Sequence, residues 1–189
     1  MQTILVLVGG ISQGSLNKKL FRAFEAQKPE NFELKTFDIS KLPFFSQDLE
    51  IAVPQVVTEF KAAIQKASGI LFITPEYNHS FPGVLKNALD WGSRPSGQNS
   101  WQQKPAGLAG ASAGNIGTFG AQAHLRHVLA ALNMPTLMQP EFYLNGSHSF
   151  DEQGRLTDEK TKTFIDKYWK SYAAWVLDHL KNLPLEKRG

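Results

Sequence analysis

Short apolar runs that fit β-strands alternate with longer stretches of helical periodicity along this 189-residue chain, and this alternation restricts the fold more than any other feature. The runs at 3–8 and 69–74 are almost continuously apolar, as in the central strands of a parallel sheet, whereas 32–37 is more polar and fits an edge. Further strands are predicted at 105–112 and around 136–138 or slightly later. Such alternation predicts a mostly parallel sheet with helices on both faces, joined by right-handed crossovers.

The helices are predicted from apolar residues that recur at spacings of three and four. They are expected at 15–26, from about 54, from 82–83, around 125–132 and over 157–180. The inward face of the last helix is predicted to consist of Phe164, Tyr168, Tyr172, Ala173, Val176 and Leu180. The chain is therefore predicted to form a doubly wound three-layer α/β/α sandwich with a five-stranded parallel sheet in the order 2-1-3-4-5, because the first and third strands look most buried.

Composition favours one globular domain without disulfides. The hydrophobic fraction is 42%, enough for a single core, so we expect one domain over 1–184 and a solvated tail over 185–189. The chain has no cysteine, which excludes a disulfide framework and a cysteine nucleophile and fits a cytoplasmic protein. Its first apolar run is too short for a signal peptide or a membrane span. A net charge of +3 mildly favours anionic ligands, but dispersed lysines and arginines argue against nucleic acid.

The segment 75–91, PEYNHSFPGVLKNALDW, carries the strongest functional signal. It follows the third predicted strand directly, and ligands of open parallel sheets bind beyond the carboxyl ends of the strands. Turn-forming residues explain the bend, but they do not explain Glu76 and Tyr77 within it. We expect the turn to meet the edge of a flat ring with Tyr77 beside it, and His79 to contact a substrate or remain solvated rather than act in catalysis.

The loop 9–17, GGISQGSLN, joins the first strand to the first helix. Its glycines permit close backbone approach, and the free amides at a helix start attract an anion such as phosphate. It matches neither the Walker pattern nor the dinucleotide fingerprint, and the simpler interpretation is a turn in which Ser15 caps the helix. Its position at the predicted switch point between the first and third strands favours phosphate binding.

Three other patterns are weaker. The small residues of 111–118, ASAGNIGT, leave room for a ligand at the end of the fourth strand, although a tight turn alone would have a similar composition. His124 and His127 lie three apart on a predicted helix, but no third ligand accompanies them at metal spacing, so we predict no metal site. Trp91 and Trp101 flank a polar stretch, 92–100, that could form a flap, while packing is the simpler role for Trp91.

The segments Pro75-Glu76-Tyr77-Asn78 and 82–91 resemble the signature of the NAD(P)H-dependent FMN reductase family, which includes quinone, chromate and azo-dye reductases. The likeness covers most of the chain, from the first strand through Pro140-Glu141-Phe142. It implies a flavodoxin-like fold, bound FMN, and NADPH or NADH as hydride donor. It also implies a small-molecule electron acceptor and self-association as a homodimer or homotetramer, with no nucleic-acid or membrane partner.

The resemblance also implies which residues hold FMN, while no side chain is expected to be catalytic because the flavin carries the chemistry. The first loop would hold the phosphate, the Pro-Glu-Tyr-Asn turn would line the isoalloxazine, and the loop after the fourth strand would contribute further contacts. The implied cofactor-binding residues are Gly10, Ile11, Ser12, Gly14, Ser15, Leu16, Asn17, Pro75, Glu76, Tyr77, Asn78, Ser112 and Gly114. His79 is a candidate contact for the acceptor.

The chain departs from the family pattern at several positions. Gly10 stands where serine is usual, and Ser12 stands where arginine is usual, which removes a bidentate phosphate contact that Lys18 would have to offset. Gly120 and Ala123 replace the arginine and tyrosine linked to tetramers in the chromate-reductase branch. Two other functions stay open at this point: a flavodoxin-type electron carrier, which the basic composition argues against, and a non-redox module that binds a phosphometabolite.

Overall fold

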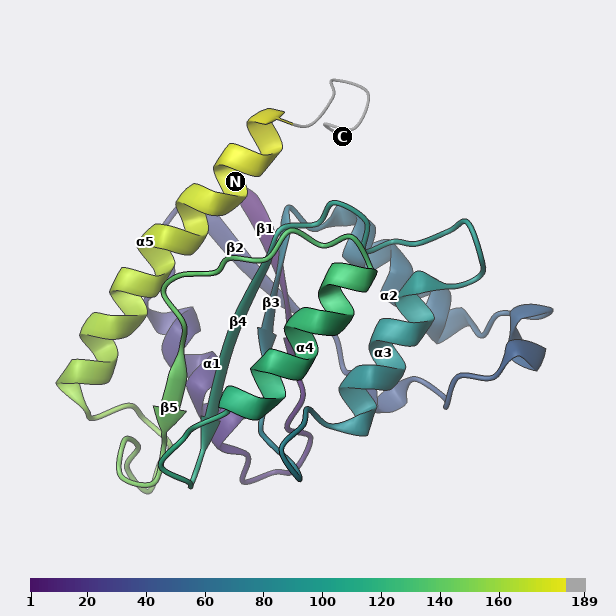
Figure 1. Ribbon diagram of the computed structural model, residues 1–189. Coiled ribbons are helices and arrows are strands. Elements are labelled where there is room, and N and C mark those ends of the chain that lie inside the picture. The colour runs from purple at the N-terminus through teal and green to yellow at the C-terminus, as the bar shows by residue number, and fades with distance from the viewer. Residues whose placement is uncertain (183–189) are drawn as a thin grey trace.

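The computed structural model describes residues 1–182 and contains one five-stranded parallel sheet in the order β2-β1-β3-β4-β5 (Figure 1). The strands are β1 Gln2–Val8, β2 Phe32–Thr36, β3 Gly69–Ile73, β4 Ala106–Ser112 and β5 Tyr143–Asn145. The predicted sandwich and strand order are confirmed. The predicted tail over 185–189, and the last two residues of the predicted domain, lie outside the described residues.

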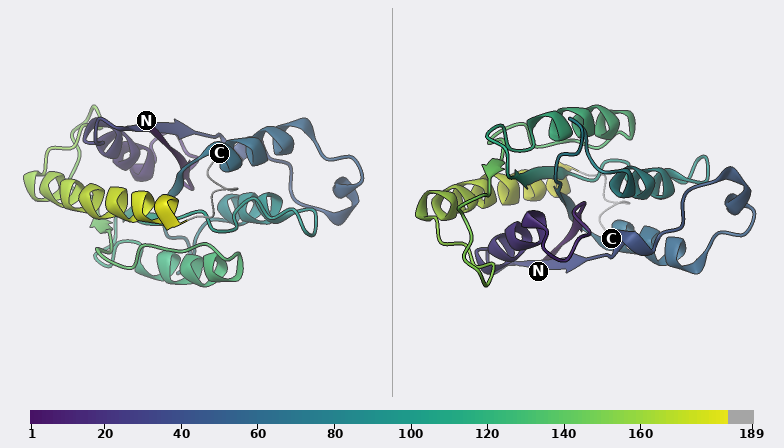
Figure 2. Two further views of the ribbon diagram at one scale, coloured as in Figure 1. Left: turned by 90° about the horizontal axis from the view of Figure 1, so that it is seen from above. Right: turned by 90° about the horizontal axis from the view of Figure 1, so that it is seen from below.

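Helices cover both faces of the sheet (Figures 1 and 2). They are α1 Leu16–Ala26, α2 Gln55–Lys66, α3 Gly83–Ser93, α4 Phe119–Ala131 and α5 Glu159–Asn182. Helices α1 and α5 share one hydrophobic core with the sheet, and α2, α3 and α4 share the other. The alternation of side chains along a strand builds both cores, so that Leu5 and Leu7 face the second core while Ile4 and Val6 face the first.

Two elements differ in detail from the sequence-based expectation. The fifth strand lies at Tyr143–Asn145, later than 136–138, where Thr136 forms only an isolated bridge to Ala106. On α5, Tyr168, Tyr172 and Val176 are buried as expected, but Ile165 and Trp169 are buried as well. The inward face of α5 is therefore wider than a single line of residues four apart.

Small residues in β4 let the aromatic face of α5 approach the sheet. A Cβ on Gly107 would lie 2.7 Å from the Tyr168 hydroxyl and 2.9 Å from the Tyr172 ring. The Tyr168 hydroxyl donates to the Leu108 carbonyl at 3.0 Å, which satisfies one polar atom in this apolar layer. Burial accordingly raises the pKa of Tyr168 well above its usual value.

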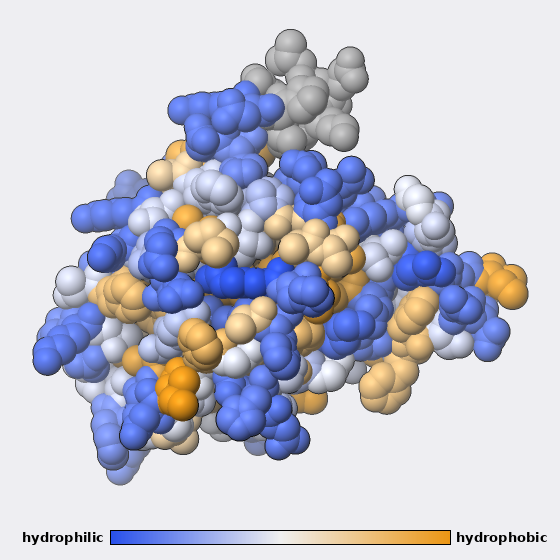
Figure 3. Space-filling model, in the orientation of Figure 1, coloured by the Kyte–Doolittle hydropathy of each residue, from blue (hydrophilic) through white to orange (hydrophobic). Residues whose placement is uncertain are grey.

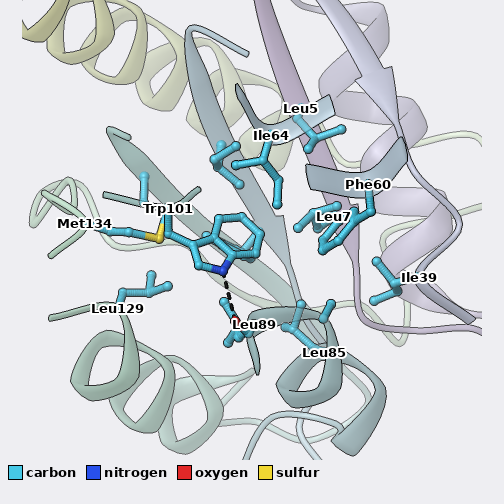
Figure 4. Packing of buried hydrophobic residues seen from close by; sticks show 14 of the residues in the cluster. Leu5, Leu7, Ile39, Phe60, Ile64, Leu85, Leu89, Trp101, Leu129 and Met134 are labelled. Carbon is cyan, nitrogen blue, oxygen red and sulfur yellow. Dashed lines mark hydrogen bonds between the residues drawn. The ribbon is translucent and has the colours of Figure 1, made fainter. Parts of the chain in front are cut away.

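Trp101 fills the centre of the other core (Figure 4). Its indole is fully buried and donates from Nε1 to the Leu89 carbonyl at 2.9 Å. Phe60 and Phe72 lie against it, at ring-centroid distances of 5.8 and 6.1 Å. Trp91 is buried too, so both tryptophans are core residues, as was expected for Trp91.

A segment that we call the arm, residues 43–54, projects from the side of the sandwich (Figure 2). It contains a short 3₁₀ helix, Gln47–Glu50. The end of the arm nearest α2 is tied to α3 by an ion pair, with Arg94 Nη2 2.7 Å from Glu50 Oε1. The Arg94 guanidinium also lies over the Phe45 ring, 5.7 Å from its centroid.

Replacement of Gly92 by alanine is expected to lower the free energy of unfolding by about 1–3 kcal/mol, because overpacking a filled core forces side chains and backbone to shift. A Cβ at this position would overlap the buried Trp101 indole. Gly83→Ala is the matched control, since no atom lies within 4 Å of its added Cβ. Urea unfolding followed by circular dichroism measures both, and equal stability of the two variants would contradict the packing argument.

Candidate functional site

Three loops meet beyond the carboxyl ends of β1, β3 and β4. The first contact joins the loop after β1 to the turn after β3: the Gly9 amide donates to the Ile73 carbonyl at 2.9 Å. A Cβ on Gly9 would lie only 3.3 Å from Thr74 Oγ1 and 3.4 Å from Pro75 Cδ. Glycine at this position therefore lets the two loops lie directly side by side, at the switch point predicted from the sequence.

The first loop presents backbone donors to solvent at the start of α1. Ile11, Ser12 and Gly14 are exposed, Leu16 is half-buried, and Gly10 is buried. Within residues 1–182, the amides of 12, 13 and 14 donate to no other protein atom. Free amides beside a helix N-terminus form a cradle for an anion. Lys18 adds a positive charge nearby, with its Nζ 2.8 Å from the Ile11 carbonyl.

Two polar side chains of this loop are occupied inside the protein. Ser15 is the N-cap of α1, and its hydroxyl accepts from the Asn17 amide at 3.2 Å. The Asn17 side chain is 1% exposed and makes two hydrogen bonds to Ala111, one from Nδ2 to the carbonyl and one to Oδ1 from the amide, both at 2.9 Å. Both side chains therefore shape the loop, and the Asn17 Oδ1 acceptor and the Ala111 carbonyl oxygen are both engaged within the protein.

The Asn17 contact takes the place of a missing strand. The register between β3 and β4 ends at Ile73 and Ala109, because the chain leaves the sheet at Pro75. Alternate residues of a strand point to the same edge, so Ala111 is the next residue whose backbone groups face that side. Without Asn17 these two groups would be buried and unpaired, at a cost of about 1–3 kcal/mol each.

The turn after β3 is a tight hairpin whose two central residues are not glycine. Tyr77 and Ser80 exchange backbone hydrogen bonds of 2.8 and 3.0 Å. Between them Asn78 and His79 have φ angles of 51° and 60°, the pattern of a type I′ turn. Pro75 is buried, whereas the Tyr77, Asn78 and His79 side chains are exposed. The hairpin thus holds an aromatic ring and an imidazole at the edge of the three-loop cluster.

Glu76 fastens this hairpin to α4. Its Oε2 accepts from the Ala121 amide at 2.9 Å, in the first turn of the helix, where a carboxylate is favoured by free N–H groups and the helix dipole. Its Oε1 lies 3.4 Å from His79 Nδ1. A Cβ on Gly120 would lie 3.0 Å from the His79 carbonyl and 3.2 Å from Glu76 Oε1, so the close approach needs a small residue there.

The loop after β4 is held in shape by Ser112. Its hydroxyl donates to the Gly117 carbonyl at 2.7 Å and accepts from the Gly114 amide at 3.2 Å. Gly114 itself is exposed. Nearby, a Cβ on Gly110 would overlap Thr118 Oγ1, and it would also overlap the Thr74 carbonyl. Small residues here, as expected from the sequence, allow the ends of β3, β4 and α4 to converge.

The second half of the 75–91 segment has a structural role that the sequence did not reveal. Asn87 is buried, accepts from the Phe45 amide at 2.8 Å and donates to the Pro43 carbonyl at 2.9 Å. Trp91 Nε1 donates to the same Pro43 carbonyl at 2.7 Å. Lys86 and Asp90 form an exposed ion pair along the helix, 2.8 Å apart. The helix therefore anchors the base of the arm.

Among residues 1–182, no cluster of three His, Cys, Asp or Glu side chains could hold a metal ion. His124 instead places its Nδ1 3.1 Å from the Ser80 hydroxyl, and His127 is exposed. Within the same part of the chain, none of the helices combines the length and apolarity that a membrane crossing would need.

Comparison with known proteins identifies the family. The sequence profile described as NADPH-dependent FMN reductase matches residues 2–149, which is most of the chain. The chain belongs to this family. The family, the flavodoxin-like fold, an oxidoreductase activity, and FMN with a nicotinamide donor were all predicted and are confirmed.

Individual relatives agree with this membership. A 2-hydroxy-1,4-benzoquinone reductase from a Burkholderia species is 45% identical over 176 residues, covering 93% of this chain and 96% of the relative. A quinone reductase from Pseudomonas putida is 41% identical, covering 92% and 94%. The solved flavoenzyme NAD(P)H:(acceptor) oxidoreductase FerB from Paracoccus denitrificans superposes with a TM-score of 0.90 at 37% identity, covering 95% of this chain and 99% of that one.

Asn17→Ala is expected to lower the free energy of unfolding by about 2–6 kcal/mol, because it leaves the buried amide and carbonyl of Ala111 without partners. The same change is expected to weaken FMN binding, since α1 and the first loop are no longer fixed against β4. Asn115→Ala is the control for stability, because Asn115 is exposed and, among residues 1–182, its side chain accepts a hydrogen bond only from Asn145. Thermal melts and a flavin titration give both quantities, and wild-type values for Asn17→Ala would contradict the clamp.

Proposed function

We propose that this enzyme of the FMN reductase family reduces small quinones with electrons from NADH or NADPH. The names of two relatives, at 45% and 41% identity over almost the whole chain, carry the choice of acceptor, because both are quinone reductases. Azo compounds, chromate and free flavin are the further acceptors that the sequence resemblance implies. FMN, when bound, supplies the redox chemistry, and the protein supplies binding, orientation and electrostatics.

The residues present fit FMN. The free amides of 12–14 at the start of α1 form a cradle for the phosphate, although Ser12 offers no guanidinium to hold it. The converging glycines 9, 110 and 120 bring three loops within backbone reach of one ligand. The proposed cofactor contacts lie in the first loop, the hairpin and the loop after β4, and Asn17 acts there through the position of the backbone.

The hairpin would shape the acceptor side of the site. The Tyr77 ring is 54% exposed and free to lie against a flat ligand, because its backbone is fixed by the pairing with Ser80. The His79 imidazole is exposed, and its Nδ1 lies 3.4 Å from Glu76 Oε1. His79 is therefore placed to contact a quinone oxygen and to return a proton to it after reduction.

The purified protein is expected to bind FMN and to oxidise NADH or NADPH when a benzoquinone is present. The visible absorbance of the protein and the decay at 340 nm measure the two properties separately. A yellow protein without turnover would favour the flavodoxin-type electron carrier. A colourless protein that takes up no added FMN would refute the flavin assignment.

His79→Ala is expected to lower kcat for the quinone several-fold and to leave FMN affinity unchanged, because its side chain lies outside the phosphate cradle.

We propose further that the enzyme assembles as a homodimer through the arm. Phe44 and Ile51 are 86% and 92% exposed, although the base of the arm is tied to α3 by hydrogen bonds, a ring contact and an ion pair. The hydrophobic colour at the far end of this projection is visible in Figure 3. Large apolar side chains on an ordered projection favour burial against a second protein surface, and the family resemblance makes a second copy of this chain the expected partner. The resemblance also implies a homotetramer as an alternative, and we propose a cytoplasmic location, which the absence of cysteine fits.

The double variant Phe44→Ser/Ile51→Ser is expected to have half the molar mass of the wild type in size-exclusion chromatography with light scattering. Met138→Ser is the control, because Met138 is also exposed but lies away from the arm, in the segment between α4 and β5. A monomeric wild type, or a variant that keeps the wild-type mass, would contradict assembly through the arm.

A further inference from the structure

A pocket of about 330 Å³ lies beside the first loop, on its β2 side. It is bounded by the carboxyl ends of β1 and β2, by α1, and by the segment that follows β2. None of its lining residues belongs to the 75–80 hairpin or to the loop after β4. The pocket is therefore separate from the place assigned to the flavin ring, although it shares Gly10 and Ile11 with the first loop.

The pocket combines an apolar floor with two opposite charges at its rim. Val6, Val8, Phe21, Phe37 and Ile39 supply the apolar surface. Lys18 and Asp38 supply the charges, and Thr36 and Ser40 add hydroxyl groups. Its volume is at the lower end of the range of about 300–1,000 Å³ for small-molecule sites, so it suits a nucleoside-sized fragment rather than a whole dinucleotide.

Asp38 keeps one oxygen available. Its Oδ1 accepts from the Ser40 amide at 3.2 Å and from the Ser40 hydroxyl at 2.6 Å, which fixes the carboxylate at the start of a 3₁₀ turn over Ile39–Lys41. Its Oδ2 makes only a loose ion pair with Lys41, at 4.0 Å. Hydrogen bonds from Ser40, with smaller contributions from Lys41 and Lys18, lower the pKa of Asp38, so the carboxylate is ionised at neutral pH.

The position of Asp38 just beyond β2 indicates which ligand the pocket could take. In nucleotide-binding α/β sheets, a carboxylate that follows the second strand accepts hydrogen bonds from the ribose hydroxyls of an adenosine, next to a glycine-rich loop after the first strand. Asp38 lies two residues beyond β2, and the glycine-rich loop lies at the other rim of the pocket. The apolar floor offers a surface for a flat base between them.

We propose that this pocket holds the adenosine end of the nicotinamide dinucleotide, with Asp38 accepting from the ribose diol. This inference rests on the proposed use of NAD(P)H by the enzyme. It also specifies the donor. The 2′-phosphate of NADPH would stand beside the Asp38 carboxylate, so the chain selects NADH over NADPH.

The first test measures binding without turnover. Isothermal titration of the purified holoenzyme is expected to detect 5′-AMP and to show weaker binding of adenosine 2′,5′-bisphosphate, which carries the extra phosphate. Asp38→Asn is expected to weaken 5′-AMP and to reduce the difference between the two probes. Asp48→Asn, in the first turn of the 3₁₀ helix of the arm, is the control that should change neither. Thr36→Trp places a large ring at the pocket from an exposed position of β2 and is expected to block 5′-AMP.

The second test measures selectivity. The ratio of kcat/KM for NADH to that for NADPH is expected to fall about tenfold in Asp38→Asn, because an unfavourable contact between two anions is removed. An enzyme that oxidises NADH but binds no 5′-AMP, or that keeps its wild-type ratio in Asp38→Asn, would overturn the inference and leave the proposed function intact. Equal 5′-AMP affinity in wild type and Asp38→Asn would overturn it as well. A wild-type protein that oxidises neither dinucleotide would instead refute the proposed function, and 5′-AMP binding would then test the pocket alone.

Discussion

The amide side chain of Asn17 bridges two parts of the molecule that no strand pairing can join. β3 leaves the sheet at Pro75 to form the hairpin beside the ligand site, whereas β4 continues to Ser112. The backbone groups of Ala111, which face β3, therefore have no strand partner. Asn17 replaces the lost partner with a donor and an acceptor on one rigid group. The chain can therefore open a binding site between two central strands without leaving buried backbone groups unpaired.

Much of the fold followed from local patterns in the sequence. The continuous apolar runs of β1 and β3 and the more polar β2 were enough to order the sheet. A strand buried on both faces has a continuous apolar sequence, whereas a strand with one wet face alternates apolar and polar residues. The fifth strand was harder to place, since only three residues pair there and the preceding segment around Thr136 also touches β4. The burial of Ile165 and Trp169 was not predicted, because α5 packs across a broad apolar surface rather than along one narrow stripe.

The loops of the candidate site were predicted from the sequence, but the structural roles of individual side chains in those loops were not. Composition and spacing placed Asn17, Glu76 and Ser112 near a ligand, and the structure shows that their polar atoms mainly hold loops in position. Asn87 and the pocket beside Asp38 depend on contacts between residues more than twenty positions apart, which no local pattern encodes. The family resemblance implied the cofactor, whereas these tertiary contacts arise only when distant segments of the chain pack together.

The left-handed backbone at Asn78 and His79 restricts which amino acids can replace these two residues. Asparagine, aspartate and glycine adopt such angles at little cost, whereas β-branched residues do so only with strain. Mutational tolerance across the hairpin is consequently uneven: two central positions are restricted by backbone geometry before any ligand is considered. Tyr77, one residue earlier and in extended pairing with Ser80, has no such restriction. Changes in acceptor range are therefore more accessible to laboratory or natural evolution through residue 77 than through the tip of the turn.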